Sequence, residues 1–171
     1  MRTPSSTRHS RSRAGLALAG LFAALVALVA LPGTAWAACA RYTCDGHDPN
    51  VQTWQSGPFT ASGPYDFGGG FSIELRKGTT DSDPYAWARA RFPGGSNENE
   101  YTMYVERCHL DHTVCEILGS RQAGGSWTTS AGANSNYYIT RSGMFYDASD
   151  RTIRACLYHG DWNSRTCTGW A

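Results

Sequence analysis

Hydrophobic and polar residues alternate in several short segments of the chain, which is the period of a strand with one buried face. The clearest segment is FSIELR, where Phe71, Ile73 and Leu75 alternate with serine, glutamate and arginine. YTMYVERC and TIRACLY alternate in the same way, and YAWARARF places alanines on one face and large residues on the other. YYITR and MFYD are further short runs of strand-forming residues.

The stretches between these segments are rich in glycine, proline, asparagine and serine, as in FGGG, FPGGSNENE, QAGGSW and SAGANSN. Such residues form turns and loops. None of the segments has the apolar period of a helix. We therefore expect an all-β fold, a single antiparallel β-sandwich or small barrel of about seven strands stapled by disulfides.

The first 37 residues have a different character from the rest. Residues 1–13 contain four arginines and no acid, residues 14–31 are apolar, and AWA follows at 35–37. These are the three parts of a secretory signal peptide. A membrane anchor is the alternative, because the apolar run has nearly the length that spans a bilayer. The Pro-Gly break and the small-residue cleavage pattern favour a signal peptide at 1–37, then one secreted domain at 38–171 with no stable membrane anchor.

Loss of the signal peptide would change the charge of the protein. The chain has 15 basic and 14 acidic residues, and four arginines lie within residues 1–37, so residues 38–171 carry a formal charge of −3. Lys77 is the only lysine. Because nucleic-acid-binding domains need a basic face, we expect no nucleic-acid partner.

All six cysteines lie after residue 37, and six cysteines in an exported chain indicate three disulfides. The sequence alone leaves every pairing open, but the cysteines fall into three close pairs. These are Cys39 with Cys44, Cys108 with Cys115, and Cys156 with Cys167. We expect each pair to close its own short loop.

The stretch RCHLDHTVC places two cysteines and two histidines within a few residues. Cys108, His109, His112 and Cys115 have side chains that bind zinc. Zinc requires cysteine thiolates, however, and an oxidising compartment consumes them as disulfides. We therefore expect a Cys108–Cys115 bridge across a polar turn, histidines that face solvent, and neither a metal nor a cofactor.

Three short motifs follow one another in the first half of residues 38–171. They are C-x4-C-x-G-x-D-P, E-L-R and A-W-x-R, on Cys39, Cys44, Gly46, Asp48, Pro49, Glu74, Leu75, Arg76, Ala86, Trp87 and Arg89. In this order they resemble the YjfA-like family of small secreted bacterial domains, which is common in actinobacteria. The resemblance implies secretion and a cystine-containing β domain, and it brings no catalytic residue. Two further cysteines that members often carry are both missing here, as expected if they form one bridge.

Candidate catalytic groups are histidines beside acids: His47 with Asp48, His109 and His112 with Asp111, and His159 with Asp161. None has the spacing of a known catalytic motif. A secreted hydrolase or nuclease site that combines Glu74, Arg76 and a histidine is the enzymatic alternative. The acidic stretches DGHDP and DSDP offer oxygen ligands for calcium, although such aspartates ordinarily form turns. We predict a non-enzymatic protein with no catalytic residue.

Aromatic residues are abundant, with nine tyrosines in the chain and five of the six tryptophans after residue 37. Tyr85 and Trp87 alternate with alanines on one strand, and Trp127 and Trp162 lie in turn-rich stretches. Exposed aromatic residues on a rigid scaffold bind partners, although the same residues also fill cores. We predict a secreted binding or adaptor module that uses these four residues. The expected partner is another extracellular protein in a multi-protein assembly, with a glycan as the alternative.

Overall fold

The computed structural model describes residues 38–94, 100–122, 129–130, 137–160 and 164–171, with the backbone alone for residues 122, 129 and 130. Ala38–Ala171 forms one compact unit. The predicted signal peptide lies outside the described residues. Within the described ranges, no helix has the length and apolar character needed to span a bilayer.

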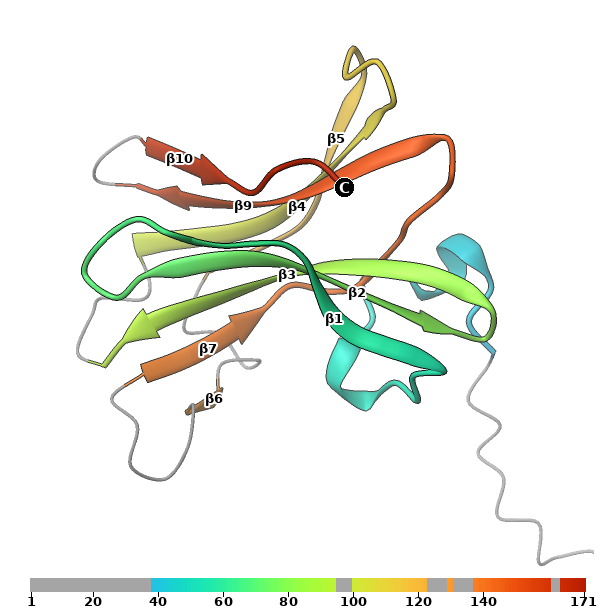
Figure 1. Ribbon diagram of the computed structural model, residues 1–171, viewed down its shortest axis with the longest axis horizontal. Helices are drawn as coiled ribbons and strands as arrows, with labels where there is room; N and C mark the ends of the chain where they lie inside the picture. Colours follow the sequence, from blue (N-terminus) through green and yellow to red (C-terminus); the bar gives the residue numbers. More distant parts are fainter. Residues whose placement is uncertain (1–37, 95–99, 123–128, 131–136, 161–163) are drawn as a thin grey trace, which may run out of the picture. The chain divides into compact units, whose positions relative to one another are not determined.

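The domain is a sandwich of two antiparallel sheets, which confirms the predicted fold class (Figure 1). Sheet A has the strand order β1-β2-β3-β7-β6, and the short strand β8 also pairs with β3. Sheet B has the order β10-β9-β4-β5. The strands of sheet A are β1 (Ser56–Asp66), β2 (Ser72–Thr80), β3 (Asp83–Pro93), β6 (Thr129–Ser130), β7 (Tyr137–Arg141) and β8 (Phe145–Tyr146). Those of sheet B are β4 (Tyr101–His109), β5 (Cys115–Gln122), β9 (Arg151–His159) and β10 (Ser164–Cys167).

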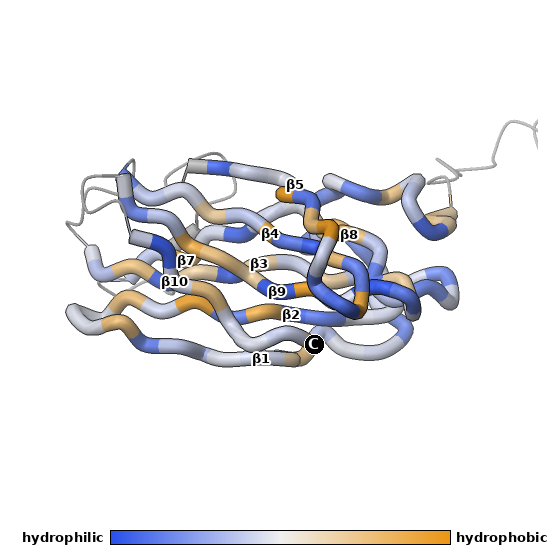
Figure 2. Tube along the Cα trace, turned by 90° about the horizontal axis from the view of Figure 1, so that it is seen from above, coloured by the Kyte–Doolittle hydropathy of each residue, from blue (hydrophilic) through white to orange (hydrophobic). Residues whose placement is uncertain are grey.

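The main core lies between the sheets and consists of the residues that the alternation places on one face. Its largest contributors are Ile73, Leu75, Phe92, Tyr101, Met103, Val105, Phe145, Ile153 and Leu157, each at most 4% exposed. The alanines of YAWARARF belong to the same core. Figure 2 shows apolar and polar positions along these strands. Burial of one face of each sheet is the main source of stability in such a sandwich.

The edge strand β1 is an element that the hydrophobic pattern did not predict. Its sequence, SGPFTASGPYD, lacks sustained alternation, and most of its residues are exposed. Its register with β2 is interrupted at three places. Gly57 and Gly63 lie at interruptions with φ values of +85° and +93°, and a Cβ on either would lie 2.9 Å from a carbonyl oxygen of β2. Bulges of this kind are common at sheet edges, where they limit further strand pairing.

Residues 38–55, which contain the short helices η2 (Arg41–Cys44) and η3 (Pro49–Val51), cover one end of the outer face of sheet A. Two backbone hydrogen bonds fasten this segment to Met144, the residue just before β8: Gly46 N donates to Met144 O at 2.8 Å, and Met144 N donates to His47 O at 2.9 Å. Cys39 and Cys44 pack with Met144 in a second buried cluster. The outer face of sheet A is therefore buried at this end and accessible farther along.

The three disulfides have the predicted local pairs. Cys39–Cys44 closes the η2 turn within the N-terminal segment. Cys108–Cys115 joins β4 to β5, and Cys156–Cys167 joins β9 to β10. In each hairpin the two cysteines face each other in register, with Cα atoms 4.0 and 4.1 Å apart. All six cysteines are consumed, and none is free.

Candidate binding site

Arginine side chains gather on the accessible part of the outer face of sheet A. The alanines of β3 point into the core, so the alternate residues Arg89 and Arg91 point outward. The strand register places Arg89 between Glu74 of β2 and Arg141 of β7. We use the term arginine face for Arg76, Arg89, Arg91 and Arg141.

One carboxylate orders two of these arginines. Glu74 is 7% exposed and accepts a hydrogen bond from Arg89 Nε through one oxygen. Its other oxygen accepts a hydrogen bond from Thr60 Oγ1 at 2.6 Å. Arg76 donates to Thr60 Oγ1 at 2.8 Å and to the carbonyl of Pro58 at 2.9 Å. The guanidinium groups are thus held in fixed positions, but a single glutamate does not neutralise them both.

The pKa values of two arginines reflect this crowding. Partial burial lowers the pKa of Arg76 and of Arg141, and the positive charge of Arg89 lowers both further. Glu74 opposes the shift at Arg76, and Asp48 opposes it at Arg141. Arg76 and Arg141 nevertheless keep their charge at neutral pH, because the ordinary pKa of an arginine side chain lies far above 7. The arginine face therefore combines three partly buried arginines with the exposed Arg91.

Two hollows lie along the arginine face and share Arg89 in their linings. The larger has a volume of about 270 Å³, and its lining includes Arg76, Arg89, Arg141, Asn50, Gln52 and Trp54. The smaller has a volume of about 150 Å³, and its lining includes Arg91, Ser72, Glu74 and Ile139. Together they make a cationic track along β3.

Trp54 forms an aromatic wall of the larger hollow. Its ring stacks on Trp87, with centroids 4.9 Å apart and an interplanar angle of 21°. Its Nε1 donates to the carbonyl of Pro49 at 3.1 Å. A Cβ on Gly78 would lie 2.5 Å from the Trp54 ring, so glycine at this β2 position lets the indole lie against the strand. Trp54 is half-buried, which leaves part of its ring accessible.

The binding role predicted for Tyr85 and Trp87 assumed that their rings are exposed, and the structure contradicts that exposure. Both lie on the face opposite the alanines, as expected, but residues 38–55 cover them and leave them 0% and 3% exposed. Tyr85 donates its hydroxyl to the carbonyl of Arg41 at 2.7 Å. The other two candidates, Trp127 and Trp162, lie outside the described residues.

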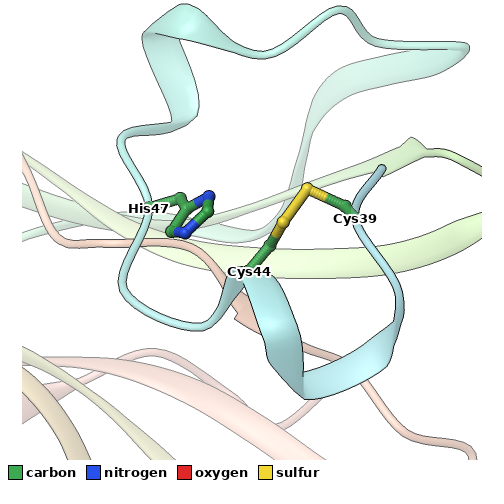
Figure 3. Close-up of side chains that lie close together, drawn as sticks. All are labelled: Cys39, Cys44 and His47. Carbon is green, nitrogen blue, oxygen red and sulfur yellow. A yellow bond between two sulfur atoms is a disulfide. The ribbon is translucent and has the colours of Figure 1, made fainter. Parts of the chain in front are cut away.

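The sulfur atoms of RCHLDHTVC form a disulfide, as predicted. Cys108 and Cys115 come close to Glu106, and Cys39 and Cys44 come close to His47 (Figure 3). Because each sulfur pair is bonded internally, it supplies no thiolate to a metal. His112 is exposed and its ring stacks on Trp170, with centroids 4.6 Å apart.

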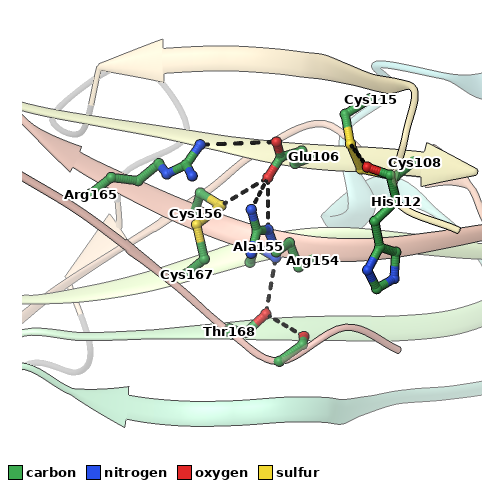
Figure 4. A network of polar contacts seen from close by, with 11 residues as sticks. Glu106, Cys108, His112, Cys115, Arg154, Ala155, Cys156, Arg165, Cys167 and Thr168 are labelled. Atoms are coloured by element: carbon green, nitrogen blue, oxygen red, sulfur yellow. Dashed lines mark hydrogen bonds and ion pairs between the residues drawn. A yellow bond between two sulfur atoms is a disulfide. The ribbon is translucent and has the colours of Figure 1, made fainter.

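The outer face of sheet B carries a separate polar network (Figure 4). Glu106 is 8% exposed and forms ion pairs with Arg154 at 2.6 Å and with Arg165 at 3.9 Å. The Cys156–Cys167 bridge packs beside the same carboxylate. Arg154 also lies over the ring of Trp170, 4.1 Å from its centroid. These contacts pair the buried charge within the sheet, as a buried carboxylate requires.

None of the histidines named as catalytic candidates is among the described residues that line these two hollows, but His159 lines a separate hollow of about 180 Å³ together with Phe67, Leu157, Ser164 and Thr166. His47 is exposed beside the Cys39–Cys44 bridge. His159 is 5% exposed, 3.6 Å from Glu100, and its ring packs against Tyr101. Asp161 lies outside the described residues. Glu74 and Arg76 are therefore brought together with other arginines rather than with a histidine.

The acidic stretches proposed for calcium act as backbone acceptors. Asp81 accepts from the amide of Cys39 at 2.8 Å, and Asp83 accepts from the amide of Arg41 at 2.7 Å. Asp48 accepts from the amide of Asn50 at 2.9 Å in a short turn. These bonds correspond to the turn and anchoring roles typical of aspartate.

Comparisons with models of protein families, with curated proteins and with solved structures found no match. The resemblance to the YjfA-like family therefore stays a prediction from the three sequence motifs.

Proposed function

We propose that the protein is a secreted, non-enzymatic binding module that holds an extracellular partner against the outer face of sheet A, as an adaptor or subunit of an extracellular assembly. The observation that carries this proposal is the arginine face. Four arginines gather on one side of a domain that has a formal charge of −3 over residues 38–171. Such local charge on a rigid sheet favours recognition of an acidic partner.

The chemistry of the hollows supports binding rather than catalysis. Their described linings offer guanidinium groups, amides and an indole, with Glu74 as the only acid. Glu74 is already engaged by Arg89 and Thr60. General acid–base catalysis requires a group that can exchange a proton with the substrate. Guanidinium groups bind and orient anions but do not exchange protons near neutral pH.

A glycan is the second candidate partner, and the larger hollow favours it. Trp54 offers an aromatic surface to a sugar ring, while Asn50 and Gln52 offer amides to sugar hydroxyls. This combination of apolar surface and a few polar groups is typical of small-molecule sites. Its volume of about 270 Å³ suits one unit of a larger ligand.

Two matched variants of residues 38–171 test the proposal. The outer-face variant carries Arg91→Gln and Arg141→Gln on sheet A, and the control variant carries Arg151→Gln and Arg165→Gln on sheet B. Both lose two positive charges. The tagged proteins are incubated with culture supernatant from the producing organism, and the captured proteins and glycans are identified by mass spectrometry. We expect the wild-type protein and the control variant to capture the same partner and the outer-face variant to lose it. Equal capture by all three proteins would refute the role of sheet A.

An enzymatic role is tested separately with purified protein. Nuclease and glycosidase substrates should remain uncleaved. An activity that disappears when His47, His109, His112 and His159 are replaced together, while the fold stays intact, would refute the non-enzymatic proposal.

A further inference from the structure

We propose that the arginine face binds the anionic sugars of an acidic polysaccharide, with Trp54 packing against a sugar ring. This inference rests on the proposed function, because it names the ligand class of the same site. The shared chemistry is a sugar that carries an oxyanion, either a carboxylate or a sulfate ester.

The charge of the site favours an anionic ligand. Four arginines line the two hollows, and the only acids among the described residues that line them or act on their arginines are Glu74 and Asp48. Burial lowers the pKa values of Arg76 and Arg141, and the positive charge of Arg89 lowers them further; an oxyanion between these guanidinium groups would relieve that repulsion. Arginine forms two parallel hydrogen bonds with a carboxylate or sulfate, so it suits such groups better than lysine does.

The arrangement of the arginines favours a polymer over a single small anion. Arg89 and Arg91 are alternate residues of β3, so their Cα atoms lie about 7 Å apart along the strand. Arg141 lies beside Arg89 on the neighbouring strand, about 5 Å away across the sheet. Because the two hollows share Arg89, a chain that fills both presents its charged groups to different arginines.

The aromatic wall favours a sugar over an acidic peptide. One side of the Trp54 ring stacks on Trp87, and the indole is fixed by its hydrogen bond to the Pro49 carbonyl. The accessible part of the ring is a rigid apolar surface, which complements the C–H face of a pyranose ring. Asn50 is exposed beside it and offers its amide to hydroxyl groups.

The same features argue against a nucleic acid. Single-stranded nucleic acids bind on exposed aromatic residues onto which successive bases stack. Here Trp87 is 3% exposed and already covered by Trp54.

The existing contacts of the arginines prepare the site for its ligand. Arg89 is held by Glu74, and Arg76 is held by Thr60 and the Pro58 carbonyl. Side chains that are already ordered lose less conformational entropy when a ligand binds.

Isothermal titration calorimetry with defined polymers tests the inference. The probes are polygalacturonate, dextran sulfate, neutral dextran, polyglutamate and single-stranded DNA, each titrated into wild-type protein, the outer-face variant and the control variant. We expect polygalacturonate or dextran sulfate to bind. The polymer with the higher affinity shows whether the site prefers a carboxylate or a sulfate ester. Binding should weaken with added salt. The outer-face variant should lose at least about tenfold in affinity, equivalent to about 1.4 kcal/mol, and the control variant should stay within about twofold of wild type.

Three outcomes would overturn the inference: no binding of either acidic polysaccharide, equal losses in both variants, or tighter binding of polyglutamate or DNA. Circular dichroism verifies that both variants are folded. If Arg141→Gln prevents folding, Arg91→Gln alone, compared with Arg165→Gln alone, keeps the test decisive because Arg91 is exposed. If no polysaccharide binds but the outer-face variant still loses a captured protein partner, the ligand class is wrong and the proposed function stands.

Discussion

Replacement of Trp87 by alanine tests whether residues 38–55 form part of the folded domain. Trp87 is 3% exposed, and its ring lies between β3 and the segment that carries Trp54. Truncation of a buried large aromatic residue costs about 3–5 kcal/mol in unfolding free energy. For a domain of this size we expect each kcal/mol to lower the melting temperature by roughly 3–5 °C, so the total decrease should be roughly 10–20 °C.

Trp54→Ala is the matched comparison, because Trp54 stacks on Trp87 but is only half-buried. Its substitution should lower the unfolding free energy by about half as much or less, because folding buries less apolar surface of Trp54 than of Trp87. Stacked aromatic pairs contribute about 0.5–1.5 kcal/mol beyond their burial, so the double variant should be more stable than the sum of the single losses by about that amount.

Urea unfolding of the four proteins measures these energies and thermal unfolding measures the melting temperatures, both followed by far-ultraviolet circular dichroism. A Trp87→Ala melting temperature within about 3 °C of wild type would refute the packing argument, because truncating an exposed residue changes stability by less than about 0.5 kcal/mol. Strictly additive losses would show that the two rings do not interact.

Two further predictions concern Tyr85 and two glycines with positive φ values, Gly119 and Gly68. Burial and nearby Asp83 and Asp45 raise the pKa of Tyr85 to about 12. The neutral hydroxyl therefore contributes its full stabilisation below about pH 10, the ordinary pKa of tyrosine. This contribution should be lost as the pH rises towards 12. Urea midpoints at pH 8 and 11 should therefore fall less in Tyr85→Phe than in wild type, and an equal fall would contradict the shift. Gly119 and Gly68 both have positive φ values, +58° and +91°. A Cβ on Gly119 would lie 2.5 Å from the Phe145 ring, whereas a Cβ on Gly68 would have no atom within 4 Å. Gly119→Ala should thus destabilise the domain by more than about 2 kcal/mol and Gly68→Ala by about 1 kcal/mol, and indistinguishable urea midpoints would contradict this difference.

The strands with regular alternation could be predicted from the sequence because one face of each is buried in the main core. β2, β3, β4 and β9 are of this kind. The local disulfides could also be predicted, because hairpin strands bring cysteines that are close in sequence into register. β1 could not be predicted in this way, because its glycine-proline bulges interrupt the alternation. It is also an edge strand, which pairs only with β2.

The candidate site depended on long-range packing that local patterns do not reveal. Periodicity placed Trp87 on the correct face of β3 but gave no indication that residues 38–55 cover that end of the sheet. Trp54 was not singled out because its sequence neighbours form no regular element, although Gly78 within a strand is a signal of close approach. Arg141 joins the arginine face only through the pairing of β7 with β3, which are separated by nearly 50 positions in the sequence.

Both cross-strand disulfides lie in sheet B, and the third closes a turn in the segment before β1, so no bridge is built into a strand of sheet A. The two cross-strand disulfides and the arginine face consequently occupy different sheets. Mutational drift on the accessible part of sheet A can change surface charge and ligand preference without disturbing a cysteine. The domain thus has the organisation of an evolvable scaffold, in which substitutions on the accessible part of one sheet leave the cross-strand disulfides of the other intact.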